Sequence, residues 1–315
     1  NFMKKDSKIL IIGHGSLAGR ALLRRLRANG YKKILTIPVE DLVNQNVVEG
    51  FFKKNKPNYV FLMDVKSGGI IANSTYPAEF IYDNLQAQTN VIHYAYKTKV
   101  KRLLFMASSC AYPKNCPQPM KEEYLLSGPL EPTSEAFAIA KIAGIKMCQY
   151  YNLQYGTDFI CAIPATIYGP GDNFDLKTSH IIPALIRKLH TAKVNNRPNV
   201  TVWGSGKPRR EFIHIDDLVD AVVFIMQKPK TPPVINIGTG SDISISELAG
   251  LLKDTVDFKG KFNFDRTKPD GVAKKLLDTA QLKSIGWAAK TGLKTGLGNL
   301  YRWYVKHEED VKFES

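Results

Sequence analysis

The 315-residue sequence lacks any uninterrupted apolar run of the roughly 18 residues that a membrane-spanning helix needs. Residues 1–8 also lack the apolar segment of a secretory signal. These two absences argue against membrane insertion and export. We therefore expect a cytoplasmic protein with no membrane partner.

Cysteine is scarce, with four residues in the chain. Their spacing matches neither a zinc motif nor a disulfide framework, so we expect no metal site. Free thiols suit a reducing compartment. The four residues are Cys110, Cys116, Cys148 and Cys161.

Acidic residues are few beside basic ones: 29 Asp and Glu against 44 Lys and Arg, for a net charge of +15. Such an excess favours anionic partners, from diphosphates to nucleic acids. The basic residues are scattered, however, and lack the interleaved aromatic residues of a base-stacking surface. We expect a small anionic ligand and no nucleic acid.

Short apolar runs alternate with helical patterns through the first half of the chain. This alternation predicts an α/β fold with a Rossmann-type, doubly wound parallel sheet, because right-handed crossovers place helices on both faces. Strands are expected at residues 8–12, 33–37, 59–63, 102–106 and 159–163, and helices at 17–26, 47–52, 80–96 and 137–151.

The alternation of apolar runs and helical patterns becomes less regular after residue 168, where segments rich in Gly, Pro and Asn begin. We expect a nucleotide-binding domain over residues 1–168, completed by a return segment at about 212–238 with a strand at 234–237. A smaller C-terminal α/β substrate lobe is expected from residues 169–211 and 239–315. In that lobe, Ser244 and Glu247 have the spacing of a helix capping box.

A glycine-rich turn joins the first expected strand to the first helix. Its backbone can approach a pyrophosphate closely, and the helix N-terminus supplies amide hydrogens. The turn predicts a dinucleotide site. Ser16 stands at the middle position, where the fingerprint expected for such a turn has glycine, so we expect slight widening of the backbone. The predicted cofactor-binding residues here are Gly13, Gly15, Ser16, Leu17 and Gly19.

The end of the second strand normally selects between NAD and NADP, through an acid or an arginine. Residues 36–38, Thr-Ile-Pro, supply neither. Glu40 or Lys33 could take that place, and the residues alone leave the choice open.

The fourth strand runs into Ser108, and about thirty residues later a helix carries Phe137 and Lys141. This spacing is typical of dehydrogenases that use a Ser, Tyr and Lys trio. Hydride transfer at a sugar carbon requires a proton to move on the attached oxygen, and the trio moves that proton. Two of the three are present. Phenylalanine stands where the tyrosine is expected.

Motifs spread over nearly the whole chain resemble those of the GDP-L-fucose synthase family of extended short-chain dehydrogenases. They lie at residues 68–70, 108–113, 131–133, 138–144, 168–170, 172–174, 179–180, 202–204, 209–212, 268–271 and 275–278. The resemblance implies epimerisation at carbons 3 and 5 of GDP-4-keto-6-deoxy-D-mannose, followed by reduction at carbon 4 with a nicotinamide hydride. It favours NADP(H) without excluding NAD(H), and it implies a homodimer formed through helices near 80–97 and 136–151.

The resemblance also assigns residues. Cys110 and His180 become the base and acid pair, and Lys141, Ile167 and His180 join the cofactor contacts. The expected contacts to the GDP-sugar are Leu185, Lys188, Trp203, Arg210 and Lys275. Structural alternatives stay open: His180 as a helix cap, Trp203 as a core residue, and Arg210 paired with Glu211 or Asp216. Asp64 falls where small apolar residues are usual, and the sequence gives no reason for it.

A phenyl ring cannot donate a proton, so Phe137 predicts impaired reduction with epimerisation intact. We favour an engineered substitution over natural loss, because Ser108, Cys110, Lys141 and His180 all remain. Two alternatives are kept: an enzyme for another GDP-4-keto sugar, such as a heptose or dideoxy sugar, and a non-catalytic relative that binds nucleotide sugars.

Overall fold

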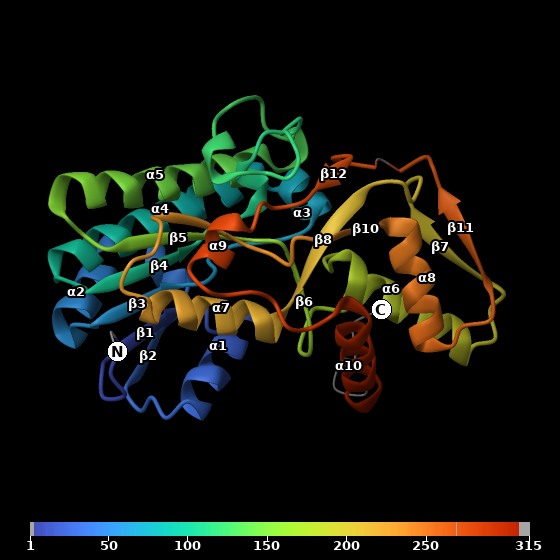
Figure 1. The fold of residues 1–315 in the computed structure, drawn as a ribbon, viewed down its shortest axis with the longest axis horizontal. Helices are drawn as coiled ribbons and strands as arrows, with labels where there is room; N and C mark the ends of the chain where they lie inside the picture. Colours follow the sequence, from blue (N-terminus) through green and yellow to red (C-terminus); the bar gives the residue numbers. More distant parts are fainter. Residues whose placement is uncertain (1–2, 269, 309–315) are drawn as a thin grey trace.

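The computed structural model describes residues 3–268 and 270–308; Pro269 of the expected 268–271 motif lies outside them. Figure 1 shows a larger part built on a wide sheet and a smaller lobe of short strands and helices beside it. Within the described ranges, no helix has the length and apolar character needed to cross a membrane.

The larger part contains a six-stranded parallel sheet in the order β2-β1-β3-β4-β5-β9. Strands β1, β3, β4, β5 and β9 are buried throughout, as expected when helices cover both faces of a sheet. The expected doubly wound fold is confirmed, including the late returning strand. The strands are β1 Ile9–Ile12, β2 Ile34–Ile37, β3 Tyr59–Leu62, β4 Arg102–Met106, β5 Phe159–Pro164 and β9 Val234–Ile237.

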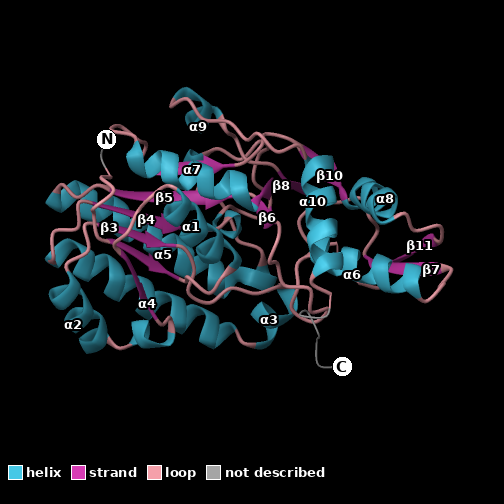
Figure 2. Ribbon diagram, turned by 90° about the horizontal axis from the view of Figure 1, so that it is seen from below, coloured by secondary structure: helices cyan, strands magenta, loops and turns pink. Residues whose placement is uncertain are grey.

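Helices cover the two faces of this sheet (Figure 2). Helices α1 and α7 pack together on one face, and α2, α4 and α5 pack on the other. Gly156, in the left-handed region at φ 66°, ends α5. The bounds are α1 Leu17–Ala28, α2 Gln45–Asn55, α3 Ile70–Thr75, α4 Pro77–Lys97, α5 Glu135–Tyr155 and α7 Ile215–Gln227.

The smaller lobe has its own apolar core, which includes Phe174, Ile186 and Leu248. Its central strand β8 pairs with β6, β10 and β12, while β7 pairs with β11. The predicted capping box of Ser244 and Glu247 is confirmed at the start of α8. The elements are β6 Thr166–Tyr168, α6 Ile181–Val194, β7 Asn199–Trp203, β8 Arg209–His214, β10 Asp242–Ser244, α8 Ile245–Val256, β11 Lys261–Asp265, β12 Lys274–Lys275 and α10 Leu293–Lys306. The short helix α9 Ala280–Ser284 packs against β9 of the larger part.

The chain after β12 returns to the larger part. Leu277, Leu282 and Trp287 lie in the larger core, although the range 239–315 was expected in the lobe. Glu211, 2% exposed, accepts hydrogen bonds from the backbone N–H groups of Leu277, Thr239 and Gly240 at 2.6–2.8 Å. This carboxylate therefore ties β8, β12 and the loop after β9 together.

Candidate functional site

The glycine turn after β1 is tightly closed. A Cβ atom on Gly13, whose φ is +76°, would lie 2.5 Å from the Asp64 carbonyl oxygen, and one on Gly19 would lie 2.0 Å from the Gly13 oxygen. Ser16 Oγ accepts from Gly19 N at 3.1 Å and donates to Gly13 O at 2.8 Å. Ser16 therefore caps α1 and tightens the turn, contrary to the widening expected from its replacement of glycine.

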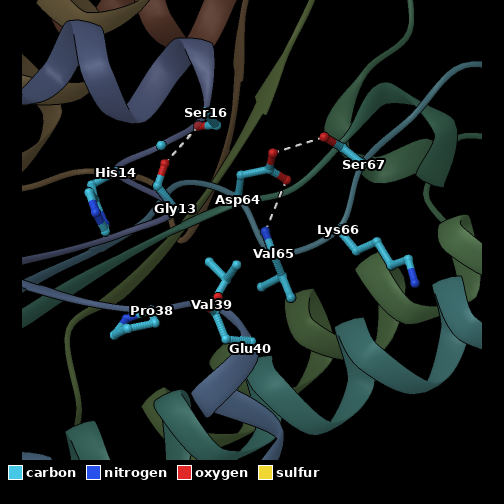
Figure 3. A pocket seen from close by; sticks show the side chains of 11 residues that line it. Gly13, His14, Ser16, Pro38, Val39, Glu40, Asp64, Val65, Lys66 and Ser67 are labelled. Atoms are coloured by element: carbon cyan, nitrogen blue, oxygen red, sulfur yellow. Dashed lines mark hydrogen bonds between the residues drawn. The ribbon is translucent and has the colours of Figure 1, made fainter. Parts of the chain in front are cut away.

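A cleft of about 590 Å³ opens at the carboxyl ends of β1, β2 and β3 (Figure 3). This is where nucleotides bind to such sheets. Glu40 lines the cleft, whereas Lys33 precedes β2 at the opposite end of that strand, so Lys33 is not placed to select a cofactor. The lining residues are Gly13, His14, Gly15, Ser16, Pro38, Val39, Glu40, Asp64, Val65, Lys66 and Ser67.

This cleft fits a dinucleotide. Gly15 has open space around the position of a Cβ atom, which lets a ligand approach the backbone beside the N-terminus of α1. The one lysine in the lining, Lys66, is engaged by Glu79 at 2.6 Å and Asp83 at 2.8 Å. The histidine of the turn, His14, also lines the cleft.

Lys141 and Phe137 lie about one turn apart on α5, close to the end of β4. Lys141 is 3% exposed, and its Nζ donates to the Met106 carbonyl at 3.2 Å. The same atom lies 5.4 Å from the centroid of the Phe137 ring. Burial lowers the pKa of Lys141, and the Asp64 carboxylate opposes this only in part. The predicted pairing of this lysine with position 137 is therefore present, without a hydroxyl.

Asp64 links the cofactor cleft to two predicted catalytic residues. Its carboxylate accepts from Val65 N at 2.9 Å and Ser67 Oγ at 2.8 Å, at the end of β3 (Figure 3). Its charge favours the protonated forms of both Lys141 and His180. Sequence reasoning left Asp64 unexplained, because this proximity arises only when β3, α5 and the start of α6 come together.

Cys110 lies in a 3₁₀ turn, Ser109–Ala111, that follows β4. Its N–H donates to Ser108 Oγ at 3.2 Å, and Lys275 Nζ lies 3.8 Å from its Sγ. Burial alone would raise the pKa of this thiol, but Lys275 and hydrogen bonds from Ser108 and Ser134 bring it below its ordinary value. The residue as a whole is part-exposed and is not a closed core residue.

His180 occupies the N-cap position of α6. Its side chain makes no capping hydrogen bond, so the simple cap interpretation does not describe it. The residue is open to solvent on one side, while the surrounding protein desolvates the imidazole and lowers its pKa, against a smaller opposing effect of Asp64.

The residues assigned to the nucleotide sugar differ in how far their side chains are exposed. Trp203 is 51% exposed, with the ammonium groups of Lys188 and Lys268 each 5.5 Å from its ring, so it is not a core residue. Leu185 is 3% exposed in the core of the lobe and offers little surface to a ligand. Ile167, which was expected to contact the cofactor instead, lies in β6 and is part-buried against the larger core.

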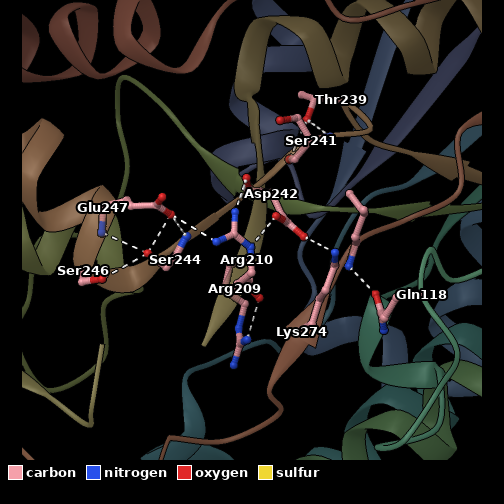
Figure 4. Close-up of polar contacts among 11 residues, drawn as sticks. Gln118, Arg209, Arg210, Thr239, Ser241, Asp242, Ser244, Ser246, Glu247 and Lys274 are labelled. Carbon is pink, nitrogen blue, oxygen red and sulfur yellow. Dashed lines mark hydrogen bonds and ion pairs between the residues drawn. The ribbon is translucent and has the colours of Figure 1, made fainter. Parts of the chain in front are cut away.

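Arg210 stands opposite Lys275 in the pairing of β8 with β12. Its guanidinium donates to the Arg209 carbonyl at 2.8 Å, and Glu211 is engaged elsewhere by backbone N–H groups. The neighbouring Arg209 makes the ion pairs, with Asp242 at 2.7 Å and Glu247 at 3.2 Å (Figure 4). The two adjacent arginines therefore differ in their contacts: Arg209 is paired with two carboxylates of the lobe, whereas the Arg210 guanidinium bonds a backbone carbonyl.

Comparisons with known proteins agree with this geometry. Residues 9–238 match the NAD dependent epimerase/dehydratase family. The chain is 52% identical to a putative GDP-L-fucose synthase 2 of Arabidopsis thaliana, over 97% of this chain and 94% of the relative.

Two solved structures from Campylobacter jejuni are also similar. A GDP-6-OMe-4-keto-L-xylo-heptose reductase is 40% identical with a TM-score of 0.91, covering 97% of this chain and 99% of the other. A GDP-mannoheptose C4 reductase with NADP bound is 40% identical with a TM-score of 0.89, covering 96% of this chain and 99% of the other.

Proposed function

The chain belongs to the NAD dependent epimerase/dehydratase family and, within it, to the GDP-L-fucose synthases; from this premise we propose that it converts GDP-4-keto-6-deoxy-D-mannose to GDP-L-fucose. One observation carries the proposal. A thiol with a lowered pKa, Cys110, lies two residues from Ser108, at the end of the strand where dehydrogenase chemistry is expected. Hydride transfer alone needs no such thiol, whereas removal of a carbon-bound proton needs a base.

In the epimerisation, the Cys110 thiolate takes the proton from the carbon beside the ketone. The electron pair of the broken C–H bond moves to the oxygen, and the Ser108 hydroxyl stabilises the resulting enolate. His180 returns a proton to the opposite face, which inverts the carbon. The same pair serves carbons 3 and 5.

The cofactor is NADP(H), as in the C. jejuni reductase solved with NADP, and when bound it supplies the hydride for carbon 4. The glycine turn and the N-terminus of α1 hold its pyrophosphate. NAD(H) is the second candidate, because Glu40 in the cleft suits a free ribose hydroxyl. The oxygen at carbon 4 must also gain a proton, and Phe137 cannot supply it.

The smaller lobe binds the GDP end of the substrate. Trp203 presents an exposed indole face suited to stacking on a base, while Lys188 and Arg210 supply positive charge for the diphosphate. A heptose in place of the deoxyhexose is the second candidate substrate, supported by the fold similarity to the two heptose reductases.

The proposal is tested by incubating the protein with GDP-4-keto-6-deoxy-D-mannose in D₂O, with and without NADPH. We expect deuterium at carbons 3 and 5 in both cases, and slow formation of GDP-L-fucose only with NADPH. Mass spectrometry and NMR of the recovered sugar measure both. Absence of exchange would overturn the epimerase assignment. Exchange of a GDP-4-keto-heptose alone would assign the second substrate, and binding without any exchange would favour the non-catalytic relative.

The chain is expected to form a homodimer through α4 and α5. Together these helices expose large apolar side chains, namely Tyr82 at 57%, Tyr150 at 62%, Leu153 at 82% and Tyr155 at 45%. Large apolar side chains exposed along two packed helices suit burial against a second copy.

Leu153→Arg should therefore convert the dimer to a monomer, because a guanidinium would be buried at the interface without a partner. Light scattering coupled to gel filtration measures the mass. Val194→Arg, at an exposed apolar residue of the other lobe, is the matched control and should remain dimeric. A wild-type monomer would contradict the assignment.

We place this activity in the cytoplasm. All four cysteines are free thiols, and Cys116, Cys148 and Cys161 are buried. Free thiols, including the proposed base Cys110, persist in a reducing compartment.

A further inference from the structure

The backbone at Lys275 is held in place by hydrogen bonds of the residues that follow it in the chain. The segment after β12 is fixed on one side by Met120, whose N–H donates to Leu276 O at 2.7 Å, and by Gln118, which accepts from Leu276 N at 2.8 Å. On the other side Leu277 N donates to Glu211 at 2.8 Å. These bonds join both parts of the molecule, so the backbone at Lys275 is set by the fold.

The Lys275 ammonium lies 3.8 Å from the Cys110 sulfur, although 165 positions separate the two residues. Two other polar groups bond the thiol, the hydroxyls of Ser108 and Ser134. The second charged group that faces it is Arg210 on β8. The guanidinium of Arg210 already bonds the Arg209 carbonyl at 2.8 Å.

We propose that Lys275 is a positioning residue for the epimerisation: its ammonium stabilises the Cys110 thiolate that removes the carbon-bound proton. The inference rests on the proposed function in its assignment of Cys110 as the base. It goes beyond binding of the diphosphate, which is the role expected for Lys275 from the sequence. During proton transfer the negative charge leaves the sulfur for the enolate oxygen, and Lys275 stays protonated throughout.

A nearby ammonium matters because the thiolate, and not the thiol, accepts the proton. Burial alone would raise the pKa of Cys110 and leave little thiolate at neutral pH. Lysine beside a cysteine lowers the thiol pKa by about one unit or more from about 8.5. A base with a pKa near the working pH combines a useful thiolate fraction with sufficient basicity.

The test measures the thiol directly, in protein without substrate or cofactor. Iodoacetamide modification of Cys110 is followed against pH by peptide mass spectrometry, and Cys110→Ser identifies the peptide. In Lys275→Met we expect the midpoint to rise by about one pH unit, so that modification at pH 7 slows about tenfold. Lys275→Arg should keep the midpoint within a few tenths of the wild-type value.

Lys274→Met is the matched control, because it removes a neighbouring ammonium that pairs with Asp242 at 2.9 Å. Its midpoint should equal that of the wild type. An unchanged midpoint in Lys275→Met, or an equal rise in Lys274→Met or Lys275→Arg, would overturn the inference. Should Lys275→Met fail to fold, Lys275→Gln gives the same comparison.

Deuterium exchange into the ketosugar separates this inference from the proposed function. A raised midpoint together with slower exchange in Lys275→Met supports both. If the midpoint rises in Lys275→Met but the wild-type protein shows no deuterium exchange, the proposed function is contradicted. The catalytic role of Lys275 is then contradicted with it. If Lys275→Met exchanges deuterium at the wild-type rate, the role inferred for Lys275 is contradicted and the proposed function stands.

Discussion

Phe137→Tyr is expected to raise the rate of carbon 4 reduction by about 100-fold to 10,000-fold, the usual contribution of a positioned general acid. The ring at this position is 9% exposed, and Lys141 Nζ lies 5.4 Å from its centroid. A phenol in place of the phenyl ring brings its hydroxyl within reach of that ammonium, which lowers the phenol pKa. Ser108, whose Oγ accepts from Cys110 N at 3.2 Å, is the proposed partner of the sugar oxygen.

The measurement is NADPH oxidation with GDP-4-keto-6-deoxy-D-mannose, alongside mass spectrometry of the product. Lys141→Met in the Phe137→Tyr background is the control, since the gain should largely disappear when the ammonium is removed. Deuterium exchange at carbons 3 and 5 should be similar with and without the Phe137→Tyr change. A Phe137→Tyr protein that reduces no faster would contradict the reductase assignment and favour the non-catalytic relative.

The larger sheet was predictable because its strands are short, apolar and separated by helices of clear periodicity. Even the returning strand β9 was found at its predicted residues. Helix ends were less predictable, since α5 begins at Glu135 and ends at Tyr155, beyond the apolar pattern at 137–151. Apolar periodicity records the buried face of a helix, whereas caps such as Gly156 determine where it stops.

The residues of the site differ in the same way: some could be predicted from local sequence, and others depend on contacts that form only in the folded chain. The glycine turn is local in sequence, so its place between β1 and α1 could be predicted from the spacing of its residues. The contact of Lys275 with Cys110 depends on β12 pairing with β8 and on backbone bonds to Gln118 and Met120, which no short motif encodes. Asp64 was likewise unexplained, because its charge affects the pKa values of Lys141 and His180 only when folding brings the three residues near one another.

In the proposed mechanism, the two half-reactions use separate proton carriers within one site. The proposal assigns Lys141, which is buried and bonded to Met106, to the reduction at carbon 4. It assigns Cys110 to the epimerisation, with Lys275 from the smaller lobe as its charge partner. The phenyl ring at position 137 leaves the second set of groups intact, so we expect exchange at carbons 3 and 5 even if reduction at carbon 4 is slow.

Cys110→Ala is expected to slow deuterium exchange at carbons 3 and 5 by about 100-fold to 10,000-fold, because it removes the proposed base. Cofactor binding should be retained, since the glycine turn and its cleft lie at the ends of β1, β2 and β3. NMR of the sugar recovered from D₂O measures the exchange, and fluorescence titration with NADPH measures the binding. Cys116→Ala, at a buried thiol outside the proposed site, is the matched control.

Combined with Phe137→Tyr, the same change separates the two reactions in one product analysis. The Phe137→Tyr protein should yield a sugar inverted at carbons 3 and 5 and reduced at carbon 4. The Phe137→Tyr, Cys110→Ala protein should yield a sugar reduced at carbon 4 with carbons 3 and 5 unchanged, because hydride transfer does not depend on the thiol. An inverted product from the double variant would show that another group removes the carbon-bound protons, and Cys110 would then lose its assignment as the base.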